Sequence, residues 1–367
     1  MKVLHLTAHL NTGGITTYIL GLVKPLHEYK MDIYVLSGGG ALTSAFQEAG
    51  AQTFNFNVGM KSELHPALYA ALPEIIKLIR EKQINLIHAH TRVTQVLAFW
   101  IQRFVRIPVV TTCHGFYQKR LGRRLLPAWG DRVIAISDDV RDYLISDFNL
   151  KKEKVCLIYN GIDIETLDQA YQKEDPSKAK AAYGFKPQDV VIGVIARLVK
   201  VKGQENLIRA VNILRKEFPA VRLLLVGDGE DKSRLEKMVQ DLYLGDRVLF
   251  TGGVHRIAKP LAAIDIFALP ALWREAFGLS ILEAMACQKP VVVTKTWALR
   301  RHLEEARAGI LVDPLQSGDL VNGLARLLKD PHLCQTMGKQ GRELVRKRFS
   351  LNQMAKEIAD LYSSIFF

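Results

Sequence analysis

The sequence predicts an α/β protein with two domains, each built on a parallel β-sheet. Short apolar runs alternate with helical stretches along the chain, which is typical of repeated strand–helix–strand units. The 367 residues are too many for one ordinary hydrophobic core. A polar stretch at 163–188, with no strand pattern, separates two such series. We therefore expect domains at 1–162 and 189–348, a linker at 163–188, and a cleft between the carboxyl edges of the two sheets.

Individual elements follow from periodicity: short apolar runs between turn residues predict strands, and a period near 3.6 predicts helices. In the first half, strands are expected at 2–8, 31–36, 86–89, 109–113, 133–137 and 155–159, and helices near 14–28, 66–81, 93–104 and 138–148. In the second half, strands are expected at 190–195, 221–226, 248–251, 266–269, 291–294 and 309–312. The corresponding helices are expected at 203–218, 232–242, 279–287, 317–329 and 331–348, with a last helix at 351–365.

Composition indicates a globular protein of the cytoplasm. The chain is 49% apolar and 24% charged, so it is neither disordered nor membrane-embedded in character. It contains no uncharged apolar run of about 18 residues, and it enters a strand pattern at once with no leader-like segment. Its four cysteines are scattered without metal-site or redox spacing, so we expect reduced thiols and no structural metal.

The net charge of +13 is concentrated in one stretch, 92–130, which holds seven Lys or Arg and no acid. Aromatic and aliphatic residues interleave these cations, a pattern suited to an anionic membrane surface or an anionic acceptor. The densest cations are Lys119, Arg120, Arg123 and Arg124. The alternative is a solvated helix face that packs through its apolar side. For Arg103 and Arg106 this alternative is at least as well supported as a binding surface. Nucleic-acid binding has only the charge in its favour, because no recognition motif is present.

The most informative segment is 275–283, in which Glu275 and Glu283 stand eight positions apart around Gly278. Gly278 is expected at the entrance of a helix, where free N–H groups and the positive end of the helix dipole attract an anion such as a diphosphate. A carboxylate on either side could accept hydrogen bonds from sugar hydroxyls. Either glutamate alone would be an ordinary helix residue, but the whole string favours a nucleotide-sugar site.

Three other strand ends carry candidate phosphate-binding groups. The Gly13–Gly14 turn after the first strand permits a close backbone approach, although a plain turn is the alternative. Arg197 and Lys202 follow the first strand of the second half, as a forked cation and a point charge just before a helix. Gly227, in a Gly-Asp-Gly turn after the next strand, either shapes a base pocket or serves only the turn.

Histidines gather at strand ends of the first half. His114 ends one strand, and His88 and His90 share a face of another by two-residue spacing. With no third ligand evident, ordinary core or cleft histidines are favoured over a metal pair.

In chain order these features resemble the retaining glycosyltransferases of family 4, which have the GT-B fold. The resemblance covers nearly the whole chain. It rests on the Gly-Gly turn, the strand-end His114, the Asn-Gly-Ile-Asp turn at 160–163, the R-x4-K-G element at 197–203, the Gly-Asp-Gly turn at 227–229 and the E-x7-E element at 275–283.

The resemblance implies a metal-independent transferase without a cofactor. It moves a sugar from a UDP- or GDP-linked donor to a glycan or lipid-linked acceptor, such as a lipopolysaccharide, bound mainly by the first domain. Glu275 would hold the donor sugar, Glu283 the ribose hydroxyls, and His114 would position substrate. Its donor-binding residues would be Gly14, Arg197, Lys202, Gly227, Gly278, Leu279 and Glu283. A last segment, 349–367, would return to the first domain, and the enzyme would sit on the cytoplasmic face of the membrane.

The chain departs from the family pattern in two places. Gln288 stands where the family usually has Gly, and Thr296-Trp297-Ala298-Leu299-Arg300-Arg301 replaces a usual Gly-Gly-x-Pro-Glu loop. The bulky Trp297 and the two arginines are expected to change the loop's shape and charge. The alternative function is therefore a non-catalytic sugar-nucleotide-binding protein that kept the fold.

Overall fold

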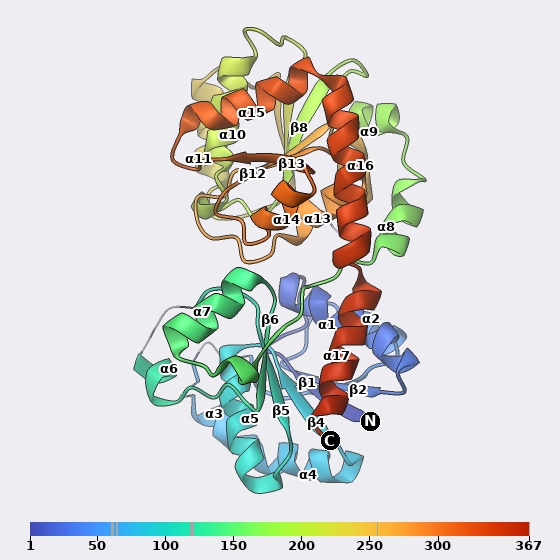
Figure 1. Ribbon diagram of the computed structural model, residues 1–367, viewed down its shortest axis with the longest axis vertical. Coiled ribbons are helices and arrows are strands. Elements are labelled where there is room, and N and C mark those ends of the chain that lie inside the picture. Colours follow the sequence, from blue (N-terminus) through green and yellow to red (C-terminus); the bar gives the residue numbers. More distant parts are fainter. Residues whose placement is uncertain (60–61, 64, 118–120, 255, 367) are drawn as a thin grey trace. The chain divides into compact units, whose positions relative to one another are not determined.

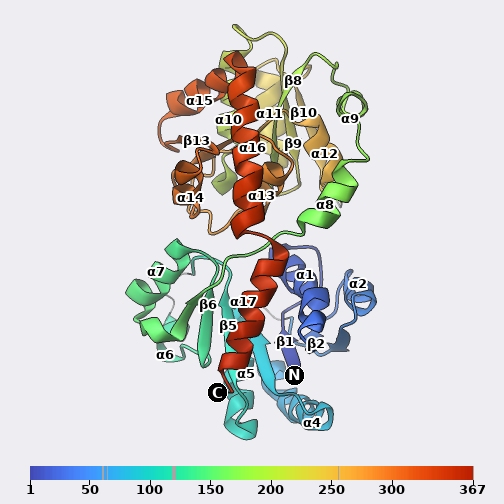
Figure 2. The ribbon, with the colours of Figure 1, turned by 45° about the vertical axis from the view of Figure 1, so that its right-hand side comes forward.

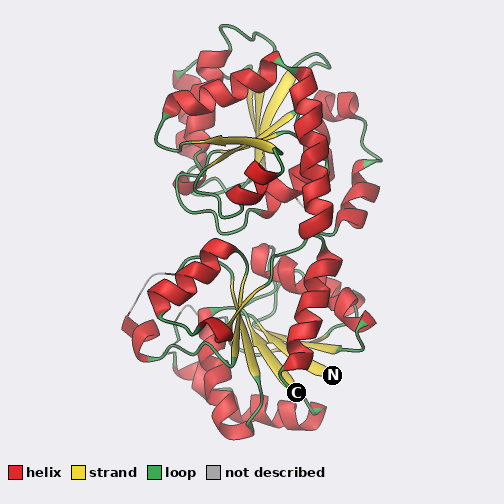
Figure 3. Cartoon of the chain, viewed as in Figure 1, coloured by secondary structure: helices red, strands yellow, loops and turns green. Residues whose placement is uncertain are grey.

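The computed structural model describes residues 1–367 except 60–61, 64, 118–120, 255 and 367, and at 121, 124 and 317 it describes the backbone alone. The chain forms two compact units (Figure 1). The first comprises Met1–Gly161 and Leu351–Phe367, and the second comprises Ile162–Ser350. Each unit is a parallel sheet covered by helices on both faces (Figure 3), so the predicted pair of parallel α/β sheets is confirmed.

The first unit has a seven-stranded sheet in the order β3-β2-β1-β4-β5-β6-β7. Its strands are β1 (Lys2–Leu6), β2 (Asp32–Ser37), β3 (Gln52–Asn55), β4 (Leu86–Ala89), β5 (Val109–Cys113), β6 (Arg132–Ala135) and β7 (Val155–Leu157). Its helices are α1 (Gly14–Glu28), α2 (Thr43–Glu48), α3 (Pro66–Ala70), α4 (Leu72–Lys82), α5 (Arg92–Val105), α6 (Leu121–Leu125), α7 (Asp138–Phe148) and α17 (Leu351–Ser364). The strand order reverses between β1 and β4, and ligands of open α/β sheets bind at such switch points.

Alternating residues of the first sheet face two different helical layers. On β1, Val3 packs into the layer that contains α1 and α17, whereas Leu4 and Leu6 face the layer of α4 and α5. The period of two along a strand explains this division. His5 therefore points to the same side as Val3, toward α1 and α17. Figure 2 shows α17 running beside the sheet within this unit.

Several local features of the first unit differ from the prediction, among them the short helices α2 and α6, which were not predicted. The strand β3 was not predicted, because Gln52–Asn55 is a short, partly exposed edge strand without an apolar run. The single helix expected at 66–81 is broken at Ala71 into α3 and α4. Pro73 stands in the first turn of α4, and because it has no amide hydrogen it cannot continue the hydrogen bonding of α3.

The second unit has a six-stranded sheet in the order β10-β9-β8-β11-β12-β13. Its strands are β8 (Val190–Ile195), β9 (Val221–Val226), β10 (Val248–Gly252), β11 (Ile266–Leu269), β12 (Val291–Thr294) and β13 (Gly309–Val312). Its helices are α8 (Ile164–Tyr171), α9 (Pro176–Ala182), α10 (Gln204–Leu214), α11 (Lys232–Asp241), α12 (Ala258–Ala263), α13 (Leu279–Ala286), α14 (Arg300–Glu305), α15 (Ser317–Lys329) and α16 (Pro331–Arg348). Its switch point lies between β8 and β11.

The polar stretch at 163–188, expected to be a linker, holds the helices α8 and α9 and belongs to the second unit. Asp168 on α8 forms a bidentate ion pair with Arg342 of α16, with oxygen–nitrogen distances of 2.8 and 2.5 Å. The Lys180 ammonium on α9 lies 2.8 Å from a carboxylate oxygen of Asp265. These helices have only eight and seven residues and bury few side chains, so apolar periodicity did not reveal them.

Candidate functional site

The segment that carries the first glutamate is a tight loop leading into α13. Gly278 has φ of 76° and precedes the first residue of the helix. A Cβ atom there would lie 2.8 Å from Ile281 Cδ1 and 3.0 Å from the Trp297 indole nitrogen, so only glycine fits this position. Because glycine has no side chain to cap the helix, the first amides of α13 remain without a side-chain acceptor. The glycine entrance to a helix that the sequence predicted is therefore present, and its binding of an anion stays a prediction.

Trp297 lies beneath this loop and fixes it. Its side chain is 1% exposed, and its indole N–H donates to the Phe277 carbonyl at 2.6 Å. The Ala298 amide donates to the Glu275 carbonyl at 2.9 Å, and the Glu275 amide donates to the Thr296 carbonyl at 3.3 Å. The loop that departs from the family pattern is thus a scaffold for Glu275. Its bulk is turned into the interior of the second unit.

Lys202 reaches the Glu275 carboxylate. The two side chains form an ion pair and are only 20% and 16% exposed. Gly203 brings them together: it has φ of 73°, and a Cβ there would lie 2.0 Å from the Pro270 carbonyl oxygen, just after β11. The turn after β8 therefore packs directly on the end of β11, next to the switch point of the sheet. A cation, a carboxylate and an uncapped helix start meet at this edge.

Arg197 and Gly227 occupy the adjoining turns. The Arg197 side chain is exposed, and its carbonyl oxygen accepts a hydrogen bond of 2.8 Å from the Gln204 amide group. Gly227 has φ of 141°, and a Cβ there would lie 2.0 Å from the Ala196 carbonyl oxygen. The glycine is therefore required for the close packing of the two turns. This structural role is the alternative that the sequence left open.

Glu283 is the fifth residue of α13 and is half-buried. Burial raises the pKa of its carboxyl group to about 7, because the surroundings disfavour the charged form. Near neutral pH this group is divided between its two protonation states. A hydrogen-bond donor that reaches it, such as a sugar hydroxyl, would favour the ionised form.

In the first unit, the turn before α1 is open. A Cβ atom added at Gly13 or Gly14 would meet nothing within 4 Å, so packing does not require glycine at either position. The space in front of the turn is available for a ligand that approaches the backbone closely.

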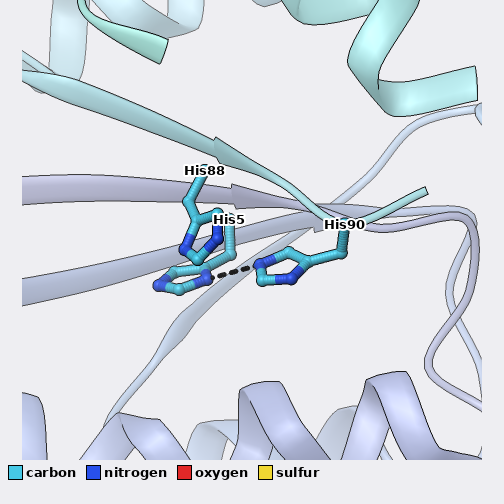
Figure 4. Close-up of side chains that lie close together, drawn as sticks. All are labelled: His5, His88 and His90. Carbon is cyan, nitrogen blue, oxygen red and sulfur yellow. Dashed lines mark hydrogen bonds between the residues drawn. The ribbon is translucent and has the colours of Figure 1, made fainter. Parts of the chain in front are cut away.

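His114 follows β5 and contacts a cluster formed by His5, His88 and His90, the three histidines drawn in Figure 4. Its Nε2 atom lies 3.2 Å from Nδ1 of His90, whose Nε2 atom lies 2.9 Å from Nδ1 of His5. Burial lowers the pKa of both His5 and His114 to about 3, so both rings are neutral. His5 was missed from the sequence. The feature that would have revealed His5 is the parallel pairing of β1 with β4, which places His5 opposite His88.

The described part of the chain has one group of potential metal ligands, formed by the ring nitrogens of His5, His88 and His90, all within 4.8 Å of one another. Each of these side chains is fully buried. The third histidine that the sequence did not reveal is therefore present.

One of the four cations of the predicted basic patch, Arg123, does not lie at the surface. Arg123 is buried, with its guanidinium carbon 4.2 Å from the Tyr117 ring centre and 4.9 Å from that of Trp129. Arg92 forms an ion pair of 3.1 Å with Glu63. Stacking on aromatic rings offsets the cost of burying a guanidinium, which is why charge alone misplaced Arg123. Lys119 and Arg120 lie outside the described residues, as does the side chain of Arg124.

Comparison with known proteins identifies the class. The family model described as Glycosyltransferase Family 4 matches residues 12–166, and that described as Glycosyl transferases group 1 matches residues 175–344. This chain belongs to the group 1 glycosyltransferases and has the GT-B fold. A glycosyltransferase from Rickettsia africae, 19% identical, superposes with a TM-score of 0.88 over 100% of this chain and 98% of its own.

Particular relatives are similar over most of their length. The N-acetyl-alpha-D-glucosaminyl L-malate synthase of Bacillus anthracis is 25% identical over 98% of this chain and 96% of its own. A UDP-Gal:alpha-D-GlcNAc-diphosphoundecaprenol alpha-1,3-galactosyltransferase of Escherichia coli is 27% identical over 80% of this chain and 78% of its own. HepE of Anabaena, solved in complex with UDP-glucose, is 27% identical with a TM-score of 0.85, over 99% of this chain and 100% of its own.

No helix in the described part of the chain is long and apolar enough to cross a membrane.

The Trp297 hydrogen bond gives a first prediction. Replacing Trp297 by Phe leaves the Phe277 carbonyl without its donor, which should lower the free energy of unfolding of the second unit by about 1–3 kcal/mol. Urea denaturation measures this. Trp273→Phe is the matched control, because Trp273 is 67% exposed and its replacement should cost less than about 0.5 kcal/mol. Equal midpoints for the two variants would show that Trp297 does not hold the loop.

Glu283 gives a second prediction, through the pH dependence of stability. Its folded pKa of about 7 exceeds its unfolded value, so the folded state holds the proton more tightly. The protonated Glu283 carboxyl makes its full contribution to the free energy of unfolding below the unfolded pKa, and this contribution is lost as the pH rises to about 7. Glu283→Gln should therefore gain stability relative to the wild type between pH 5 and pH 8, by about 1–3 kcal/mol. A difference that does not change over this range would show that Glu283 is not desolvated.

Proposed function

We propose that this glycosyltransferase moves a sugar from a nucleoside diphosphate sugar to a glycan or lipid-linked acceptor, with retention of the anomeric configuration and without a metal ion. The observation that carries the proposal is the meeting of Lys202, Glu275 and the uncapped start of α13 at Gly278. This arrangement provides positive potential for a diphosphate beside a carboxylate for sugar hydroxyls.

The leaving diphosphate is stabilised by fixed positive groups. Lys202 and the first amides of α13, at Gly278 and Leu279, address the phosphate oxygens, and Arg197 adds a forked cation from the neighbouring turn. These groups are in place before the reaction, so little reorganisation is needed as negative charge develops. They perform the work that a divalent cation does in metal-dependent transferases. A departing phosphate oxygen can itself take the acceptor proton, so no enzymic nucleophile is required.

Glu275 binds the donor sugar and Glu283 the ribose. In the free protein, Lys202 neutralises Glu275, which keeps this half-buried carboxylate compatible with its surroundings. An incoming diphosphate competes for Lys202 and leaves the Glu275 oxygens free to accept sugar hydroxyls. Glu283 accepts the ribose hydroxyls in its ionised form.

The first unit binds the acceptor, with His114 as a contact, and Gly14 keeps the donor-binding role that the resemblance implies. Because His114 is neutral and only very weakly basic, it positions substrate and does not remove a proton.

Relatives support the identity of the substrates. The similarity to HepE, solved with UDP-glucose, favours a UDP-linked hexose over a GDP-linked one. The similarity to the galactosyltransferase of Escherichia coli, named for a diphosphoundecaprenol acceptor, favours a lipid-linked glycan. With such an acceptor, the enzyme would work at the cytoplasmic face of a membrane. Leu125, within the basic stretch, is 76% exposed and is an apolar residue available for that surface.

The two glutamates should have separable effects, which tests the proposal. Glu275→Gln should abolish transfer while UDP affinity is unchanged or rises, because its partner is the sugar and its loss frees Lys202. Glu283→Ala should weaken UDP by about 1.5–3 kcal/mol, since a charged hydrogen bond is lost. Calorimetric titration and a transfer assay measure both, with Glu305→Gln, an exposed acid on α14, as the control. Equal loss of UDP affinity in both glutamate variants would contradict the assigned roles.

The metal-free mechanism makes a further prediction. Turnover should survive EDTA, and Lys202→Ala and Arg197→Ala should each weaken binding of the diphosphate sugar while leaving that of the free nucleoside unchanged, because both cations address phosphate. Lys200→Ala, an exposed cation in the same turn, should change neither affinity. Turnover that is lost in EDTA and restored by a divalent metal would refute the mechanism.

A further inference from the structure

Three histidines form a continuous hydrogen-bonded chain, and the candidate acceptor contact His114 is its outer end. His5 lies on β1, His90 follows β4 and His114 follows β5, so all three come from adjacent strands. His90 is the middle ring, with one nitrogen 2.9 Å from His5 and the other 3.2 Å from His114. His5 and His90 are fully buried. The chain thus leads from the interior of the first unit to a half-buried ring.

Ring geometry favours hydrogen bonding over metal ligation in this cluster. The His5 and His90 rings are only 10° from parallel, and in Figure 4 their facing nitrogens point at one another. Lone pairs that bind one metal must instead converge on a common point. His88 is the remaining member of the potential metal-ligand group. Both of its ring nitrogens are already hydrogen-bonded, one to the Tyr362 hydroxyl at 2.5 Å and the other to the Thr112 hydroxyl at 2.7 Å.

The chain must have a single direction. Because all of these rings are neutral, each carries one N–H and one lone pair. If His5 donates to His90, then His90 must donate to His114, and the His114 proton lies on Nδ1. If His114 donates to His90, the order is reversed, and Nδ1 of His114 carries a lone pair. The state of the inner end therefore sets the state of the outer end.

The inner end distinguishes the two directions. Nε2 of His5 is buried and has no hydrogen-bond partner. In the reversed chain this atom would be an N–H donor without an acceptor, and orphaned buried N–H groups are rarer than under-satisfied acceptors. In the forward chain it is a bare lone pair, which places the ring proton in the hydrogen bond to His90.

We propose that His5 is a positioning residue that holds His114 in the tautomer with its proton on Nδ1, by donating through His90. The inference rests on the proposed function only in giving His114 a substrate contact. Nδ1 of His114, the nitrogen not used by the chain, is a hydrogen-bond donor. It recognises a substrate oxygen that accepts a hydrogen bond, and it does not accept the proton of an attacking hydroxyl.

Nuclear magnetic resonance of the intact protein labelled with 15N-histidine tests the tautomer directly. The two neutral tautomers have different nitrogen shifts and different long-range couplings to the ring protons. His114→Gln and His5→Asn assign the two resonances by difference. We expect His114 and His5 both protonated on Nδ1. His114 protonated on Nε2 would overturn the proposal. A stoichiometric transition metal in the purified protein, with His5 resonances that move on chelation, would also overturn it.

Activity of two His5 variants supplies the second readout. In His5→Asn, the side-chain amide takes the place of the Nδ1–H donor, so His114 should keep its tautomer and most of its turnover. His5→Leu fills the volume without a donor, so the His114 resonance should show both tautomers and kcat should fall about tenfold, with a smaller change in KM. Equal turnover in both variants, with an unchanged His114 spectrum, would contradict a positioning role.

The two hypotheses fail separately. An inactive protein whose His114 carries its proton on Nδ1 would refute the proposed function and leave the inference intact. An active enzyme with the opposite tautomer would refute the inference alone.

Discussion

The hydrogen bond from the Trp297 indole to the Phe277 carbonyl anchors the loop on which the proposed donor site is built. Backbone hydrogen bonds on either side of it tie the Glu275 strand of the loop to 296–298, and Gly278 then turns into α13 against the indole ring. When the backbone of a loop is held at several points, a carboxylate on that loop has less conformational freedom. The entropy cost of ordering it then falls on folding and not on ligand binding. The indole thereby pre-organises the site.

Electrostatic balance follows from this fixed loop. Glu275 is half-buried, and a lone carboxylate there would be costly, so the Lys202 ammonium accompanies it. In the mechanism that we propose, the same cation and the start of α13 attract phosphate. Donor binding is then an exchange of partners, in which phosphate takes over Lys202 and sugar hydroxyls take over Glu275. A protein with only one of these charges would have to bury it uncompensated in the free state.

Strands covered on both faces were predictable from the sequence, because largely apolar runs such as Val190–Ile195 and Val291–Thr294 mark them. Elements held by other forces were not. The edge strand β3 has little apolar surface, and α8 is held by the Asp168–Arg342 ion pair. Helix and strand periodicity reports hydrophobic burial, and these short elements bury few apolar side chains.

The site was predictable where a residue type is required by backbone geometry or charge, as for Gly278, Lys202 and Glu275. It was not predictable where burial depends on distant partners. Trp297 lies buried under its loop, and Arg123 was expected at the surface and instead stacks on aromatic rings. His5 joined the histidine cluster only through the pairing of β1 with β4. In each case the determining neighbour is remote in the sequence.

The most direct test of this account is a crystal structure of the protein with bound UDP-glucose. The account predicts diphosphate oxygens within hydrogen-bonding distance of the Leu279 amide and the Lys202 ammonium, with Lys202 drawn away from Glu275 and the Glu275 carboxylate on the sugar hydroxyls. A diphosphate bound away from the start of α13, with the Lys202–Glu275 ion pair intact, would contradict it.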